Sequence, residues 1–389
     1  MTGPFDVDIV RLRRRRTVKW TLYGPDVLAA WVAEMDFRVA PVVRAALLEA
    51  VDREDFGYLP ADLSELTEAC AGFLASAHGW VVPATRIFPV ADVLAGISSA
   101  LEVLVEPGSP VIVPTPTYPP FFEIVELTGR PVVPVPMLVD GDGRFTLDLD
   151  AIDSALGAGA RTVLLCNPHN PTGRVFTADE HLALAAVIER HRARVITDEV
   201  HAPLVHRGHR HVPYASVSDA TAHHTVTVTS ASKAWNIPGL RCGQVVMTNH
   251  DDAARWRTLP VFQVPAPTAI GIAASIAAYR DGEPWRQELL AHLDTNRHLL
   301  GALLAGEVPE IRHRAPEGTY LAWLDCRGLG VDDPAALFLQ EGGVAVSDGP
   351  PFGAGSERHV RLNFATSTDL LEQIVAGMGR AARTVRHRG

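Results

Sequence analysis

Three polar segments carry side chains that could together do chemistry on a small molecule. They are Asn167-Pro-His-Asn-Pro-Thr-Gly-Arg174, Asp198-Glu-Val-His201 and Ser230-Ala-Ser-Lys-Ala-Trp-Asn236. Each follows a short apolar run that predicts a strand, and ligands of open α/β sheets bind outside the carboxyl ends of the strands. We therefore expect the three segments to line one cleft.

Lys233 is the candidate for covalent attachment of an aldehyde cofactor. A lysine among small and apolar residues titrates below its usual range, which suits imine formation and proton transfer. Asp198 closes a β-branched run, and a carboxylate there can keep a pyridine nitrogen protonated. Together the two residues predict pyridoxal 5′-phosphate (PLP), with Lys233 as its Schiff-base lysine. Alone, each would be read as an ordinary surface residue.

PLP also needs donors for its ring oxygen and ligands for its phosphate, and the sequence offers both. Arg241 lies eight residues after the lysine, where its planar guanidinium can hold a phosphate bidentately. The hydroxyls of Ser230 and Ser232 can donate to the same phosphate. Asn170, between two prolines, can donate to the ring oxygen. Tyr118 offers a flat face for stacking on the ring, with a purely structural tyrosine as the alternative.

The order and spacing of these residues resemble fold type I aminotransferases and their relatives. Further motifs are similar to those of the cystathionine β-lyase and C-S lyase branch of that family. These motifs are Arg16-x-x-Lys19-Trp20, Trp31-Val-Ala-Glu-Met-Asp-Phe37, Phe56-Gly-Tyr58, Cys166 to Val175, Asp198 to His201 and Asn236-Ile-Pro-Gly-Leu240. The resemblance runs from about Phe5 to Arg380 and so covers nearly the whole chain.

The resemblance implies roles that residue types alone do not fix. Tyr58 would reach the phosphate in the neighbouring subunit, and Arg361 would bind the α-carboxylate of the substrate. Both roles imply a homodimer with shared active sites. We also expect His201, Asp92 and Val93 to contact the cofactor. The expected catalytic residues are Lys233, Asp198, Tyr118 and Tyr58, and the expected substrate ligands are Arg361, Asn170 and Tyr118.

Two departures from the family pattern lie close to the expected cofactor. Relatives usually read Pro-Gly-Val-Val where this chain reads Val90-Ala-Asp-Val-Leu94, at a helix start that binds phosphate. Asp92 beside a phosphate would be repelled unless it points away or meets a donor. In the lysine loop, Ala234 stands in place of a hydroxyl residue and Trp235 in place of a smaller aromatic one. We expect the fold to tolerate both changes, whereas substrate scope and reaction outcome could differ.

The expected reaction is an α,β-elimination. A cystathionine-like or S-substituted cysteine substrate would yield thiol, pyruvate and ammonia, with Lys233 as the general base at Cα. Transamination, or a decarboxylation-linked oxidative deamination, would use the same cofactor and stays open. A binding protein without catalysis is the third alternative, but such a protein would be expected to have lost the lysine.

Apolar runs that alternate with helical stretches predict an α/β fold, with a mostly parallel sheet in a large domain and a smaller α+β domain after it. We expect an N-terminal segment (residues 1–45) packed on the small domain, a large PLP-binding domain (46–278) and a small C-terminal domain (279–389). The clearest helix is Thr177 to Arg190, with a capping box to Glu180. The candidate strands are Pro110 to Pro114, Pro131 to Val135, Thr162 to Cys166, Val195 to Asp198, Thr225 to Thr229 and Gly243 to Met247. In the small domain we expect a helix at Glu283 to Leu304 and strands at Tyr320 to Leu324 and His359 to Phe364.

Composition excludes several classes of protein. A formal net charge of −10 over 389 residues argues against nucleic acid, and the basic run Arg13 to Arg16 is typical of a solvated segment. The four cysteines lie far apart, and His209 and His211 lack carboxylate or cysteine neighbours, so no metal is expected. The N-terminus shows no secretory pattern, which predicts a cytoplasmic protein. The apolar stretch Thr268 to Tyr279 is too short to cross a bilayer, so we expect a buried helix and no membrane contact.

Overall fold

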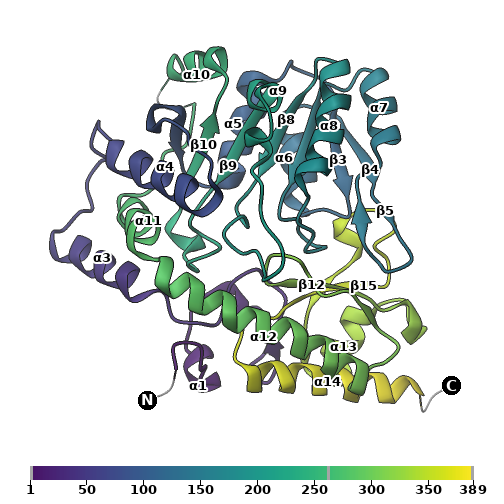
Figure 1. Cartoon of the computed structure of the whole chain (residues 1–389). Coiled ribbons are helices and arrows are strands. Elements are labelled where there is room, and N and C mark those ends of the chain that lie inside the picture. The colour runs from purple at the N-terminus through teal and green to yellow at the C-terminus, as the bar shows by residue number, and fades with distance from the viewer. Residues whose placement is uncertain (1–2, 261–262, 387–389) are drawn as a thin grey trace.

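The computed structural model describes residues 3–260 and 263–386. In Figure 1 a large sheet fills the upper half of the molecule between layers of helices, a smaller sheet lies below it, and both chain ends lie at the lower edge. The strands of the large sheet follow one another in space as β2 (Ile87–Val90), β10 (Gly243–Met247), β9 (Thr225–Thr229), β8 (Arg194–Asp198), β7 (Thr162–Cys166), β3 (Val111–Thr115) and β4 (Val132–Pro136).

The large sheet is mostly parallel. Neighbouring strands from β9 to β4 run parallel, whereas β10 runs antiparallel to both β9 and β2. The predicted fold class is confirmed, and the predicted strands differ from the observed ones by at most one residue at either end. Sequence reasoning missed β2, because this edge strand of 4 residues contains Pro89 and shows little strand pattern.

Both faces of the large sheet are buried, which explains why its strands are rich in valine without polar alternation. Val111 and Val113 of β3 point into one hydrophobic cluster, and Ile112 between them points into another on the opposite face. The helices that pack in these clusters include α5 (Val93–Leu104) and α6 (Pro120–Leu127) on the first face, and α7 (Leu149–Gly157) and α8 (Ala178–Arg190) on the second.

The predicted start of α8 is confirmed. The Thr177 hydroxyl accepts a hydrogen bond from the Glu180 backbone N–H, and the Glu180 carboxylate accepts one from Thr177 N at 2.8 Å. This reciprocal pair satisfies donors that the first turn of a helix leaves open. The remaining helices of the upper half and its flank are α3 (Pro41–Asp52), α4 (Ser64–His78), α9 (Asp219–His224), α10 (His250–Arg257) and α11 (Ala269–Asp281).

The lower half of the molecule combines a four-stranded sheet with three helices (Figure 1). The predicted helix from Glu283 is present and continues to Glu307, and both predicted strands are present within one residue of their expected bounds. The elements are β11 (Arg312–His313), β12 (Leu321–Asp325), β15 (His359–Asn363) and β14 (Ser347–Asp348), with α12 (Glu283–Glu307), α13 (Pro334–Gly342) and α14 (Thr368–Arg386). The domain boundaries at residues 45 and 278 stay a prediction.

The N-terminal segment contributes only short elements. These are α1 (Ile9–Leu12), α2 (Val18–Thr21) and β1 (Leu28–Ala29), and β1 pairs in parallel with β13 (Val344–Ala345). Elsewhere in the chain, β5 (Leu138–Val139) and β6 (Phe145–Thr146) form a separate antiparallel pair. Residues 31–37 then pass between the two halves. The Asn236 amide holds both backbone groups of Met35 at 2.9 Å, and Asn363 donates to the carbonyls of Val32 and Glu34 at 2.7 Å. The segment is thereby fixed to both halves of the molecule.

Two kinds of feature are absent from the described residues. Residues 3–260 and 263–386 contain no helix with both the length and the apolar character to span a bilayer. In the same ranges, no three histidine, cysteine or acidic side chains are grouped so that they could hold a metal ion.

Candidate active site

A cavity of about 190 Å³ lies where β7, β8 and β9 end, as the three polar segments predict. Its walls come from segments far apart in the sequence, because parallel strands bring their carboxyl ends to one edge of the sheet. The sequence-predicted residues that line it are Asp92, Val93, Tyr118, Asn170, Asp198, His201, Ser230, Ser232, Lys233 and Arg241. Arg361 lines a neighbouring cavity, and Tyr58 lines neither.

Lys233 projects into the cavity from the loop after β9. Its Nζ donates a hydrogen bond to the carbonyl of Ala33 at 2.9 Å, and the hydroxyl of Tyr320 donates to the same carbonyl at 3.0 Å. Burial lowers the pKa of the Lys233 ammonium to about 8, the nearby Arg361 guanidinium acts in the same direction, and Asp198 opposes them. The amine is therefore neutral in part of the population near neutral pH, as a nucleophile or base must be.

Asp198 is a buried carboxylate at the end of β8. Its Oδ1 accepts a hydrogen bond from the Val200 backbone N–H at 2.9 Å, and burial raises the pKa of its carboxyl to about 7. Within residues 3–260 and 263–386, no cation lies within ion-pair distance of it. His201 is also buried, and its Nδ1 has no hydrogen-bond partner there. Both groups can therefore interact with a polar ligand, and the Asp198 carboxylate suits a protonated nitrogen.

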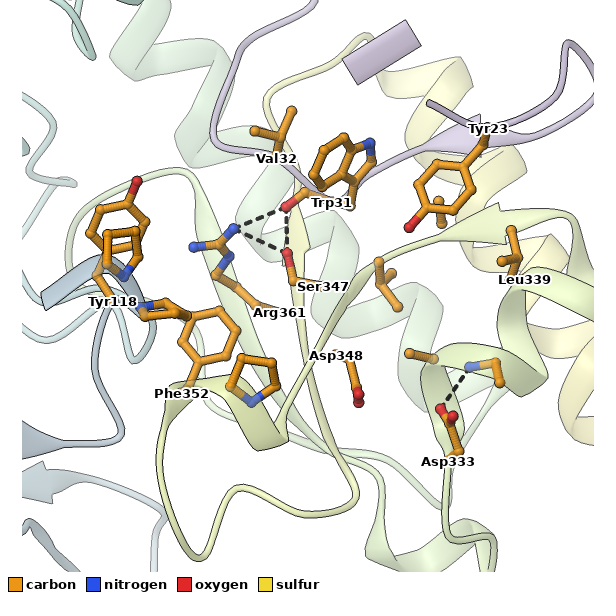
Figure 2. Close-up of a pocket in the computed structure, with 17 residues that line it drawn as sticks. Tyr23, Trp31, Val32, Tyr118, Asp333, Leu339, Ser347, Asp348, Phe352 and Arg361 are labelled. Atoms are coloured by element: carbon orange, nitrogen blue, oxygen red, sulfur yellow. Dashed lines mark hydrogen bonds between the residues drawn. The ribbon is translucent and has the colours of Figure 1, made fainter. Parts of the chain in front are cut away.

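Arg361 lines the neighbouring cavity and is held there by several contacts (Figure 2). Its Nη1 donates to Oδ1 of Asn170 at 3.0 Å, and its Nη2 donates to the Trp31 carbonyl and to Oγ of Ser347, each at 3.0 Å. The guanidinium lies over the ring of Phe352, 5.0 Å from its centroid. Its Nε is buried without a partner among the described residues, so the side chain keeps a donor for a carboxylate.

A second cavity of about 470 Å³ adjoins Arg361, and Figure 2 shows the side chains around it. Tyr118 lines both cavities and so stands at their junction. Burial raises the pKa of the Tyr118 hydroxyl, which keeps it protonated at neutral pH. The other labelled side chains around this cavity are mainly aromatic or acidic: Tyr23, Trp31, Phe352, Asp333 and Asp348.

One end of the first cavity is lined by Asp92, Val93, Ser230, Ser232 and Arg241, which include the residues expected to bind a phosphate; we call it the phosphate cup. Asp92, Val93 and Leu94 at the start of α5 line the cavity there, and helix starts can bind phosphate through their backbone N–H groups. The Ser230 hydroxyl donates to the Cys242 carbonyl at 2.6 Å, so its hydrogen is not directed to the cup. The prediction that Ser230 donates to the phosphate therefore does not match this arrangement, because the hydroxyl donates to the Cys242 carbonyl instead.

Asp92 meets a donor, which was one of the two outcomes expected for it. Its Oδ2 lies 2.8 Å from Nη2 of Arg241, and its Oδ1 accepts a hydrogen bond from the Ala95 backbone N–H at 2.8 Å. The carboxylate thus caps α5 and pairs with the predicted phosphate ligand. The pair could not be predicted from the sequence, because Asp92 and Arg241 lie far apart in the chain.

Tyr58 is fully exposed in the single chain, on the connection between α3 and α4. Phe56, two residues before it, is also exposed. The chain thus does not bring Tyr58 to its own cavity, and its expected role across a dimer stays a prediction.

The two changes in the lysine loop lie away from the cavity. Ala234 and Trp235 are fully buried, and the Trp235 indole donates to the Gly282 carbonyl at 3.1 Å while it packs on Phe73 and Tyr279. Neither residue lines the cavity, so the expected effect on substrate scope has no direct contact behind it.

Sequence reasoning missed the residues that hold the predicted ones in place. Ala33 presents its carbonyl to Lys233, and Ser347 with the Trp31 carbonyl orients Arg361. The motif Trp31 to Phe37 resembles a family motif, but backbone carbonyls carry no residue-type signal from which their roles could be inferred.

The lining of the first cavity fits PLP on the observations above. The buried Asp198 carboxylate, which has no cation of the described residues within ion-pair distance, suits the protonated pyridine nitrogen, and His201 with its Nδ1 unpartnered in the same residues also lines the cavity. Lys233 offers the amine for covalent attachment, and the phosphate cup offers a helix start with a guanidinium. The donor set therefore agrees in type with each polar group of the cofactor.

The sequence pattern of the family "Aminotransferase class I and II" matches residues 32–377. The chain belongs to this family. It is 38% identical over 367 residues to a cystathionine beta-lyase of Corynebacterium glutamicum, covering 94% of this chain and 96% of that protein. It is 34% identical over 376 residues to a cystathionine beta-lyase of Bacillus subtilis, with 93% and 97% covered. A PLP-bound C-S lyase from Staphylococcus hominis has a similar structure, with a TM-score of 0.90, 26% identity and coverage of 98% and 99%.

Proposed function

We propose that this chain is a PLP-dependent C-S lyase that acts on S-substituted cysteines. The net reaction consumes one water and converts the substrate to a thiol, pyruvate and ammonia. The observation that carries the proposal is the cavity in which Lys233 and Asp198 face one space, with Arg361 at its edge. Relatives that bear the name cystathionine beta-lyase, at 34% and 38% identity, support the choice of substrate.

The roles of the residues follow from their positions. PLP, when bound at Lys233, supplies an electron sink for negative charge at the substrate Cα. Asp198 would keep the ring nitrogen protonated, because a buried carboxylate stabilises the charged form of an adjacent base. Arg361 binds the α-carboxylate with its free donor, and Asn170 fixes the guanidinium from the cavity side.

Lys233 is the general base. Because burial brings the pKa of its ammonium to about 8, the amine can take the Cα proton and return it later without a large energetic penalty. Tyr118 lies at the junction of the two cavities, where it can orient the substrate between them. The cavity of about 470 Å³ beside Arg361 offers room for the sulfur substituent.

The functional unit in this proposal is a homodimer in the cytoplasm. Tyr58 completes the phosphate cup of the partner subunit, and its complete exposure in the single chain supports this role. Phe56 beside it would be covered in the same interface.

A panel of S-substituted cysteines tests the reaction. The purified holoenzyme is assayed for thiol, pyruvate and ammonia with substituents of graded size. Equal amounts of the three products support the lyase. A keto acid with stable conversion of the cofactor to its amine form would indicate transamination instead, and oxygen consumption with loss of carbon dioxide would indicate oxidative deamination.

A further inference from the structure

The phosphate cup contains a negative charge next to the positive charge that should bind the phosphate. Asp92 is the N-cap of α5, with one oxygen on the Ala95 N–H and the other 2.8 Å from Nη2 of Arg241. A single carboxylate therefore serves two partners at once. These partners, the first turn of α5 and the Arg241 guanidinium, are the two groups that would otherwise attract an anion.

The backbone around Asp92 is tightly packed, which fixes the point from which the side chain starts. A Cβ on Gly243, at the start of β10, would lie 2.9 Å from the backbone carbon of Asp92. The preceding residue, Ala91, donates its N–H to the Pro265 carbonyl at 2.7 Å. The wall of the cup is thus fixed by β10 on one side and by the segment before α11 on the other.

Arg241 still has donors to offer. In the part of the chain that the structure describes, Asp92 is the one ion-pair or hydrogen-bond partner of the Arg241 side chain, and Nη2 is the nitrogen nearest to it. The guanidinium carries five N–H donors, so donors remain for an anion bound in the cup. An anion bound there shares the guanidinium with Asp92, and the two negative charges repel each other.

We propose that Asp92 is a built-in counter-charge in the phosphate cup, which orients Arg241 and lowers the affinity of the enzyme for the phosphate of PLP. This inference rests on the proposed use of PLP. Its consequence is a cofactor that dissociates more readily than the covalent attachment and the other ligands alone would allow. Asp92 is a positioning residue in this account and takes no part in the reaction.

The test compares neutral replacements that keep the helix cap. Asp92→Asn and Asp92→Ser can both accept from the Ala95 N–H, because Asn and Ser are good N-caps, but they remove the charge. Asp148→Asn is the matched control: Asp148 is also a partly buried N-cap, of α7, with its Oδ1 2.9 Å from the Ala151 N–H, and it does not line the cavity. The dissociation constants of PLP and of pyridoxal, which lacks the phosphate, are measured on each apoenzyme.

We expect both Asp92 variants to bind PLP roughly three- to tenfold more tightly than wild type, as loss of a charge repulsion in a half-exposed site would produce. Their affinity for pyridoxal should not change, and Asp148→Asn should change neither value. Unchanged or weaker PLP binding by both variants would overturn the inference, and so would an equal shift for pyridoxal. If wild type bound neither ligand, the proposed function itself would fail, and the inference with it.

Discussion

Arg361 and Asn170 are joined by a hydrogen bond of 3.0 Å, although 191 positions separate them in the sequence. Arg361 lies on β15 in the lower half of the molecule, and Asn170 lies in the loop after β7 in the upper half. Arg361, the proposed ligand of the substrate carboxylate, is therefore hydrogen-bonded to Asn170, the proposed ligand of the cofactor ring oxygen. Substrate and cofactor positions are linked through one contact between the two halves.

The first prediction concerns this contact. Arg361→Ala should lower kcat/KM for S-substituted cysteines roughly 100-fold or more, since it removes the partner of a buried carboxylate. Asn170→Ala should cause a smaller loss, and the double variant should lose less than the product of the two single effects, because the residues act as one unit. Arg358→Ala, which removes a surface pair with Asp332, should leave kcat/KM unchanged. Strictly multiplicative effects would show that the contact does not couple the two sites.

The second prediction concerns the stability of the apoenzyme. Burial raises the pKa of the Asp198 carboxyl to about 7, well above its value of about 4 in an unfolded chain. The folded state therefore holds this proton more tightly, so stability present below about pH 4 is lost as the pH rises towards 7. Glu199, whose pKa burial also raises to about 7, adds to the same loss.

The measurement is urea unfolding of the apoenzyme at pH values of about 5 and 8. Between these two pH values the free energy of unfolding should fall in both proteins. The fall should be smaller in Asp198→Asn than in wild type by roughly 1 to 3 kcal/mol, because the variant keeps only Glu199 of the two raised carboxyls. Asp148→Asn serves as the isosteric control. An identical fall in wild type and Asp198→Asn would mean that Asp198 is already ionised without cost in the empty site.

The third prediction tests whether two subunits share each active site. Lys233→Ala and Tyr58→Ala should each be nearly inactive as homodimers. In a mixed dimer, one site combines Lys233 of one subunit with Tyr58 of the other and is complete. Unfolding and refolding an equimolar mixture should thus recover about a quarter of wild-type activity, because half of the dimers are mixed and each has one working site. No recovery, with dimers confirmed by sedimentation, would remove Tyr58 from the site.

The sequence predicted the central fold well because a buried parallel strand can be recognised from its own short run of apolar residues. Thr162–Cys166 and Thr225–Thr229 are uniform apolar or β-branched runs, and both strands have the predicted bounds. The antiparallel direction of β10 and the two-residue strands β13 and β14 were not predicted. Their pairing depends on partners distant in the sequence, and so short a run carries no period.

The candidate site was predictable to the same degree. Side chains with distinctive chemistry, such as Lys233 and Asp198, stood out by type and spacing, and the structure places them in one cavity. The contacts that orient them could not be foreseen. The Ala33 carbonyl and the ion pair between Asp92 and Arg241 depend on how the chain folds back on itself.

The most direct test of the account is to locate the attachment point of the cofactor. The holoenzyme is reduced with borohydride, digested, and analysed by mass spectrometry for a phosphopyridoxyl group. The account predicts this group on Lys233, and its absence, together with the loss of visible absorbance, from Lys233→Ala. A wild-type enzyme that gains no absorbance with PLP, or that carries the group on another lysine, would contradict the account.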